Sequence, residues 1–259
     1  MSTMNGPQAR LHAPGRSDKY SNSESLLEWV SHLKAVEPPC ASDGRQSASL
    51  AIETGAVTIG AVAAIRFLNM QPALEVKWLL IPCVLVIAAL LPTWLRRGQF
   101  PPMCLDRECA AGSLVLVCLT CLCAIPAVFL GLWLMVRMQL PVPLRPAVAG
   151  LGGWFTWLIY QFMYVAVAEE MFFRGYLQTN VMKWLGDTRL AGQYIAIVVS
   201  AGCFALAHVV VQGQITSLFT FLPGIILAWL FFRTRSLLAP ILFHGLANVS
   251  YGIIALTLM

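Results

Sequence analysis

The sequence predicts an all-α fold, a polytopic transmembrane helical bundle with about seven to eight spans. Charged residues make up only 11% of the 259 residues, whereas soluble domains carry about 25%. Hydrophobic residues make up 58% and gather in several long runs, and about 20 such residues in a helix cross the hydrocarbon core of a bilayer. The net charge of +5 is therefore expected to reflect membrane topology, and we expect no nucleic-acid partner.

The chain divides into three parts by composition. Residues 1–47 are polar, contain Ser, Pro and Gly throughout and lack the apolar core of a signal peptide, so they are predicted to form a disordered cytosolic tail. Within this tail, residues 23–36 can form a short amphipathic helix at the membrane interface. Residues 48–149 are predicted to hold N-terminal transmembrane helices, and residues 150–259 a transmembrane core that carries most of the unusual polar residues.

Seven apolar segments are predicted to span the membrane, at residues 50–68, 78–95, 111–136, 150–182, 190–211, 215–232 and 237–257. The first three are apolar runs separated by polar or basic loops. The fourth is long for a single crossing, and we expect its C-terminal part to emerge into the interface because it contains Gln178, Asn180, Lys183 and Asp187. The last three are apolar runs joined by short connections, one of them the basic turn "RTRSL".

The distribution of basic residues predicts the orientation of these spans. With the N-terminus in the cytosol, all but four of the 17 Lys and Arg residues fall on the cytosolic side. The four that fall outside are Arg66, Lys77, Arg137 and Arg145. We therefore expect an integral membrane protein of the bacterial inner (cell) membrane with a cytosolic N-terminus. An eighth, re-entrant segment would reverse the C-terminal half of this topology.

The eight cysteines do not predict a disulfide framework or a metal site. Five of them lie in apolar runs, where a thiol behaves as a small hydrophobic group. Cys118 and Cys121 form a CxxC pair, but no His or second CxxC lies near it in the sequence to complete a zinc site.

Several polar side chains occur at positions where the surrounding sequence is apolar. Charged groups at membrane depth cost several kcal/mol, roughly 2.5–3.5 on insertion scales, and usually face a cavity or a partner. In the fourth segment, Glu170 and Arg174 are four residues apart and can pair on one helix face, whereas Glu169 points about 100° away. In the seventh segment, His244 and Asn248 are also four residues apart and project from one face.

The positions of these residues predict that they meet. The turn "LGDTRLAG" lies near the midpoint between Glu169 and His208, so two antiparallel helices joined there hold both residues at one level. His244 follows the basic turn by about nine residues, a rise of roughly 13 Å, which places it near the cytosolic side of the membrane.

This combination of groups suits hydrolysis. A carboxylate and a His can remove a proton from water, and a second His and an Asn amide can donate hydrogen bonds to an oxyanion. No GxSxG motif supplies a serine nucleophile. Each residue alone has other interpretations: helix packing, a proton or ion pathway as in a transporter, or a His/His/Glu zinc site, although HExxH is absent.

Three motifs in order resemble those of one protease family. "EEMFFR" (169–174), "FALAH" (204–208) and "HGLAN" (244–248) resemble EExxxR, FxxxH and HxxxN of the CPBP family. This family comprises the type II CAAX prenyl endopeptidases and their bacterial relatives, intramembrane proteases of the glutamic type. The resemblance covers roughly residues 150–252, so residues 150–259 are expected to form the catalytic core. "RTRSL" departs from the RTGSL-like turn common in the family.

The resemblance implies a role for each matching residue. Glu169 would activate water together with His208, while His244 and Asn248 would form the oxyanion hole. The supporting residues would be Glu170, Arg174 and the packing residue Phe204.

The function expected from the sequence is that of an intramembrane endopeptidase with Glu-activated water. Its partners would be the lipid bilayer and a membrane-associated or lipid-modified protein or peptide substrate, and it would need no cofactor. The alternatives are a zinc-dependent version of the same protease and a non-catalytic immunity, scaffold or transport protein.

Overall fold

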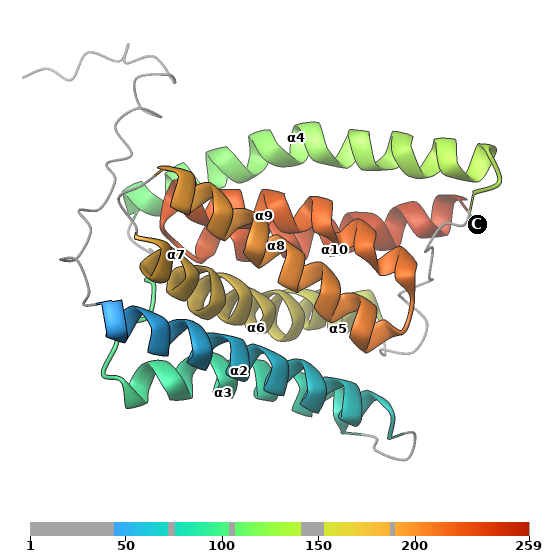
Figure 1. The fold of residues 1–259 in the computed structure, drawn as a ribbon. Helices are drawn as coiled ribbons and strands as arrows, with labels where there is room; N and C mark the ends of the chain where they lie inside the picture. Colours follow the sequence, from blue (N-terminus) through green and yellow to red (C-terminus); the bar gives the residue numbers. More distant parts are fainter. Residues whose placement is uncertain (1–43, 72–75, 104–106, 141–152, 187–189, 259) are drawn as a thin grey trace, which may run out of the picture. The chain divides into compact units, whose positions relative to one another are not determined.

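Every element of secondary structure among the described residues is a helix, in a computed structural model that describes residues 44–71, 76–103, 107–140, 153–186 and 190–258 (Figure 1). The expectation of an all-α bundle is confirmed. The predicted amphipathic helix at 23–36 and most of the predicted tail lie outside the described residues. Helix α2 begins at Gly44, and the part of it that is long and apolar enough to span a membrane begins at Ala48.

Among the described residues, six helical segments are long and apolar enough to cross a membrane, and they match six of the seven predicted spans. They are α2 (Gly44–Asn69), α3 (Lys77–Leu95), α4 (Arg107–Arg137), α8 (Leu190–Gln212), the short 3₁₀ helix η3 (Ile215–Thr220) continued by α9 (Phe221–Thr234), and α10 (Leu238–Leu258). These helices indicate an integral membrane protein.

The fourth predicted segment is helical but irregular. It consists of α5 (Trp154–Ile159), the π-helix η1 (Tyr160–Ala166), α6 (Val167–Glu170), the π-helix η2 (Met171–Gln178) and α7 (Thr179–Leu185). The π-helical turns, which hydrogen-bond from residue i to i+5, often occur at functional sites. Here they lie on both sides of the four-residue α6, which ends with the two adjacent glutamates.

This segment forms the centre of the described bundle (Figure 1). The α2–α3 hairpin packs along one side of it, while α8 packs against η2 and α10 against η1. Helix α9 packs between α8 and α10, and α4 packs against α10. Every residue from Phe172 to Gln178 is buried.

The expectation that the end of this segment emerges into the interface rested on polar residues, and two of them, Gln178 and Asn180, do not face outward. Both side chains are buried, and Gln178 Nε2 donates a hydrogen bond of 2.9 Å to the Ala228 carbonyl oxygen of α9. A hydrogen bond to the backbone of a neighbouring helix can thus satisfy a polar side chain that is buried away from water. Lys183 is exposed, and Asp187 lies outside the described residues.

The orientation of the bundle in the membrane is a prediction that labelling can test. Single cysteines at Gln46, Gln99 and Leu140, introduced into a variant without native cysteines, should react with a membrane-impermeant thiol reagent from one side only. We expect Gln46→Cys and Gln99→Cys to react from the cytosolic side, because the start of α2 and the end of α3 are predicted to lie on that side. Leu140→Cys, beyond the other end of α4, should react from outside. Cytosolic labelling at position 140 would contradict the predicted topology.

Candidate active site

Three helical segments contribute the residues predicted to form the site, and the bundle brings Glu169, His208 and His244 together. Glu169 and Glu170 end α6, and Arg174 follows on η2. Phe204 and His208 lie on α8. His244 and Asn248 lie on α10. The expected convergence of Glu169 with His208 and His244 is therefore observed.

Glu169 faces both histidines without bonding to either. Its Oε2 atom lies 4.0 Å from His208 Nε2 and 3.8 Å from His244 Nε2. This oxygen is buried and has no hydrogen-bond partner. These distances exceed the limit of about 3.2 Å for a direct hydrogen bond. Two hydrogen bonds of about 2.8 Å that meet at one oxygen atom at an angle of about 90° join atoms that lie roughly 4 Å apart. Separations of this length match those between two groups that share one hydrogen-bonded oxygen atom.

Glu170 is fully buried and accepts two hydrogen bonds at one oxygen. Arg174 Nη1 donates to Glu170 Oε1 over 2.9 Å, which confirms the pair expected from the i,i+4 spacing. His244 Nδ1 bonds to the same oxygen over 2.6 Å, a contact that the sequence spacing did not predict. Glu170 thus links the buried guanidinium to one of the site histidines.

Arg174 has further partners that hold it in the bundle. Its Nη2 atom donates to the Gly224 carbonyl oxygen of α9 over 3.1 Å. Its guanidinium carbon lies 4.7 Å from the centre of the Phe204 ring, an arrangement that favours a cation–π interaction. The same Phe204 ring contacts the imidazoles of His208 and His244, with centroid separations of 4.4 Å and 5.9 Å.

The hydrogen bonds of the two histidines fix where their protons lie. The Glu170 oxygen is already the acceptor of an ion pair, so His244 Nδ1 carries a proton and donates it. His208 Nδ1 lies 2.9 Å from the Phe204 carbonyl oxygen, which can only accept, so it also carries a proton. In both rings the remaining nitrogen, Nε2, is the atom that faces Glu169.

Asn248 bonds to a residue that the sequence analysis missed. Its Nδ2 atom donates to Gln161 Oε1 on η1 over 3.0 Å. A signal for Gln161 was present, because it is an uncharged polar residue in the apolar stretch "WLIYQFMYVAV". It carries no charge and belongs to none of the three motifs, so it did not stand out.

The distances between the donor atoms of Glu169, His208 and His244 differ from those of a tetrahedral zinc site. Zinc ligands at about 2.0–2.1 Å in tetrahedral geometry lie roughly 3.4 Å apart. The separations of 3.8 Å and 4.0 Å around Glu169 Oε2 are larger than this. Across the part of the chain that the structure describes, no group of three His, Cys, Asp or Glu side chains is arranged to hold a metal ion. Cys118 and Cys121 are free thiols, as are Cys83, Cys123 and Cys203.

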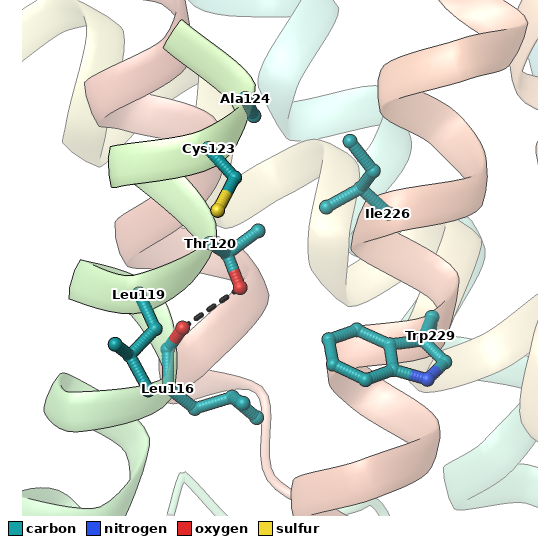
Figure 2. Close-up of a pocket in the computed structure, with 7 residues that line it drawn as sticks. All are labelled: Leu116, Leu119, Thr120, Cys123, Ala124, Ile226 and Trp229. Atoms are coloured by element: carbon teal, nitrogen blue, oxygen red, sulfur yellow. Dashed lines mark hydrogen bonds between the residues drawn. The ribbon is translucent and has the colours of Figure 1, made fainter.

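A separate groove of about 400 Å³ lies between α4 and α9 (Figure 2). None of the candidate site residues lines it. Its lining is formed by Leu116, Leu119, Thr120, Cys123, Ala124, Ile226 and Trp229. The Thr120 hydroxyl donates to the Leu116 carbonyl oxygen of its own helix over 2.7 Å, so even this polar side chain is satisfied within α4.

Comparison with known proteins identifies the part of the chain that holds the site. Residues 151–250 match a family model described as type II CAAX prenyl endopeptidase Rce1-like. No curated protein and no solved structure matches the chain. The matched segment includes Glu169, His208, His244 and Asn248, and members of this family are membrane proteases. Residues 151–250 of the chain are therefore similar to the Rce1-like type II CAAX prenyl endopeptidases.

Proposed function

We propose that this protein is an intramembrane endopeptidase that hydrolyses a peptide bond of a membrane-associated or lipid-modified protein with water activated by Glu169. The observation that carries the proposal is the convergence of two imidazole Nε2 atoms on an unbonded carboxylate oxygen within a helical bundle. The similarity of residues 151–250 to a family of endopeptidases supports proteolysis in general. The nature of the nucleophile and of the substrate is our inference.

Glu169 and His208 are the proposed base. The lone pairs of Glu169 Oε2 and of neutral His208 Nε2 can both accept a hydrogen bond from one water molecule. As the water oxygen attacks the substrate carbonyl carbon, its proton passes to this pair. The same proton is then given to the nitrogen of the leaving amine when the tetrahedral intermediate collapses. The enzyme thus returns to its starting protonation state.

His244 and Asn248 are the proposed oxyanion donors. Since His244 Nδ1 donates to Glu170, its Nε2 atom can donate to the substrate only when the ring is an imidazolium. Asn248 has a second amide hydrogen besides the one bonded to Gln161.

A zinc-dependent protease is the second candidate, and one observation favours it. Histidines that bind a metal through one nitrogen usually donate their other N–H to a carboxylate or a backbone carbonyl. His244 and His208 donate to the Glu170 carboxylate and the Phe204 carbonyl in this way. We favour the metal-free mechanism because Asn is a poor zinc ligand but a good oxyanion donor, and Asn248 lies one helical turn from His244 on α10.

A substrate can be found by comparing peptides released from membranes with the protein, without it, and with Glu169→Ala. Peptides that require both the protein and Glu169 would identify it. Identical peptide sets under all three conditions would support the non-catalytic alternatives, an immunity, scaffold or transport role.

With that substrate, we expect Asn248→Ala to lower kcat by about 10²–10³, the usual effect of removing one oxyanion donor. The matched control is Asn69→Ala on α2, an exposed Asn that donates to the Val211 carbonyl oxygen and should leave kcat unchanged.

Protein stripped with a chelator and checked by elemental analysis should remain active. Stoichiometric zinc whose removal abolishes cleavage, and whose return restores it, would overturn the metal-free mechanism.

A further inference from the structure

We infer that Gln161 is a positioning residue that aims the amide of Asn248 at the reacting carbonyl. The inference rests on the proposed function, because it assigns Gln161 a role through the proposed oxyanion donor. The contact joins η1 to α10 across 87 positions of the sequence, and the Asn248 Nδ2 to Gln161 Oε1 distance is 3.0 Å. Both side chains are partly buried.

The geometry of an amide explains how one hydrogen bond can aim another. The Nδ2 atom of Asn248 carries two hydrogens in the plane of the amide group. When Gln161 Oε1 accepts one of them, rotation about the last side-chain bond of Asn248 is restricted and the direction of the second hydrogen is fixed. An oxyanion donor that is fixed before the reaction does not have to reorient as charge develops.

The spacing between the two helices is set by the residues next to this pair. Gly245 lies one turn before Asn248 on α10, and the Phe162 ring beside Gln161 covers it closely. A Cβ atom on residue 245 would overlap three atoms of this ring. The glycine therefore allows η1 and α10 to approach closely, and this approach brings the Gln161 amide within reach of Asn248.

The π-helical turn has a related effect on η1. Gln161 and Phe162 lie near the start of η1, and Glu169 follows on α6 after the wider turn. The widened hydrogen-bond pattern changes the angular relation between residues on its two sides from that of a regular α-helix. One continuous helical segment can thereby present Gln161 to Asn248 and Glu169 to the two histidines.

A purely structural role for Gln161 makes a different prediction from a positioning role. Hydrogen bonds between helices stabilise many membrane proteins, and losing one lowers stability without regard to the catalytic residues. Gln178→Leu provides this comparison, because Gln178 is a buried glutamine of the same helical segment that bonds to the Ala228 carbonyl oxygen of α9. The two variants remove the same type of side chain and a similar hydrogen bond.

The test is a double-mutant cycle on the full-length protein, with a peptide whose release from membranes requires both the protein and Glu169 as the substrate. Gln161→Leu should lower kcat about 10- to 10²-fold with little change in KM, since a misplaced catalytic group can lose up to about 10² in rate. In the Asn248→Ala background the same substitution should cause no further loss, because the donor it positions is already gone. Gln178→Leu should change kcat by the same factor in both backgrounds.

The outcomes separate this inference from the proposed function. Equal losses of kcat from Gln161→Leu with and without Asn248 would overturn the positioning role, and so would an unchanged kcat. If Asn248→Ala and Glu169→Gln both retained normal turnover, the proposed function itself would fail. Melting temperature and detergent-extracted yield report folding. If Gln161→Leu does not accumulate, Gln161→Met, which is unbranched like Gln, takes its place in the cycle.

Discussion

Glu169→Gln is expected to lower kcat by about 10²–10⁴ while the protein still folds. The substitution keeps the size of the side chain but removes the carboxylate that accepts the proton of water, and a positioned general base contributes about this factor. Folding should survive because Glu169 Oε2 has no hydrogen-bond partner and the side chain remains 19% exposed. The loss should therefore appear in catalysis and not in stability.

The matched control for this prediction is Glu53→Gln on α2. Glu53 pairs with Arg96 Nε over 3.2 Å, and both side chains are 34% exposed. Pairs of this kind contribute about 0–1 kcal/mol, so the variant should fold normally and cleave at the normal rate. Turnover measured at saturating substrate, normalised to folded protein, decides the outcome. Near-normal cleavage by Glu169→Gln would show that another group activates the water.

Glu170→Gln is expected to lower both stability and turnover, in contrast to its neighbour. Arg174 would remain fully buried without a charged partner, and breaking a buried ion pair costs about 3–5 kcal/mol of unfolding free energy. The same substitution removes the charge that holds His244 Nδ1. Unfolding in detergent should show the loss of stability. The protein that remains folded should still have a low kcat.

A double substitution can separate these two effects. Replacing a buried ion pair by apolar residues of similar size is often neutral or stabilising. The combination Glu170→Leu with Arg174→Met should therefore regain much of the stability that Glu170→Gln loses. Turnover should stay low, because His244 still lacks its acceptor. A double variant that is both stable and active would show that His244 does not need Glu170.

Sequence alone predicted the spans well because the thickness of the bilayer limits their length. The expected segment 78–95 corresponds to Lys77–Leu95, and 237–257 corresponds to Leu238–Leu258. The pairing of Glu170 with Arg174 was predicted for a similar reason, since both residues lie on one helix and helical geometry fixes their relation.

Contacts between helices were predicted less completely. The bond between Glu170 and His244 joins residues 74 positions apart, and neither helical period nor hydropathy relates α6 to α10. The burial of Gln178 was missed because a polar residue near the end of an apolar run fits both the interface and the protein interior. The π-helical turns of η1 and η2 had no signal, since their hydrogen-bond register depends on neighbouring helices.

The order of the site residues along the chain has a consequence for biosynthesis. A ribosome completes the segment containing Glu169 well before α10, because His244 and Asn248 follow it by more than seventy residues. Until α10 has packed against η1, the nascent chain lacks both proposed oxyanion donors and the partner of Glu170. A half-made chain in the membrane would thus be inert toward neighbouring proteins. Peptide-bond cleavage would begin only when assembly is complete.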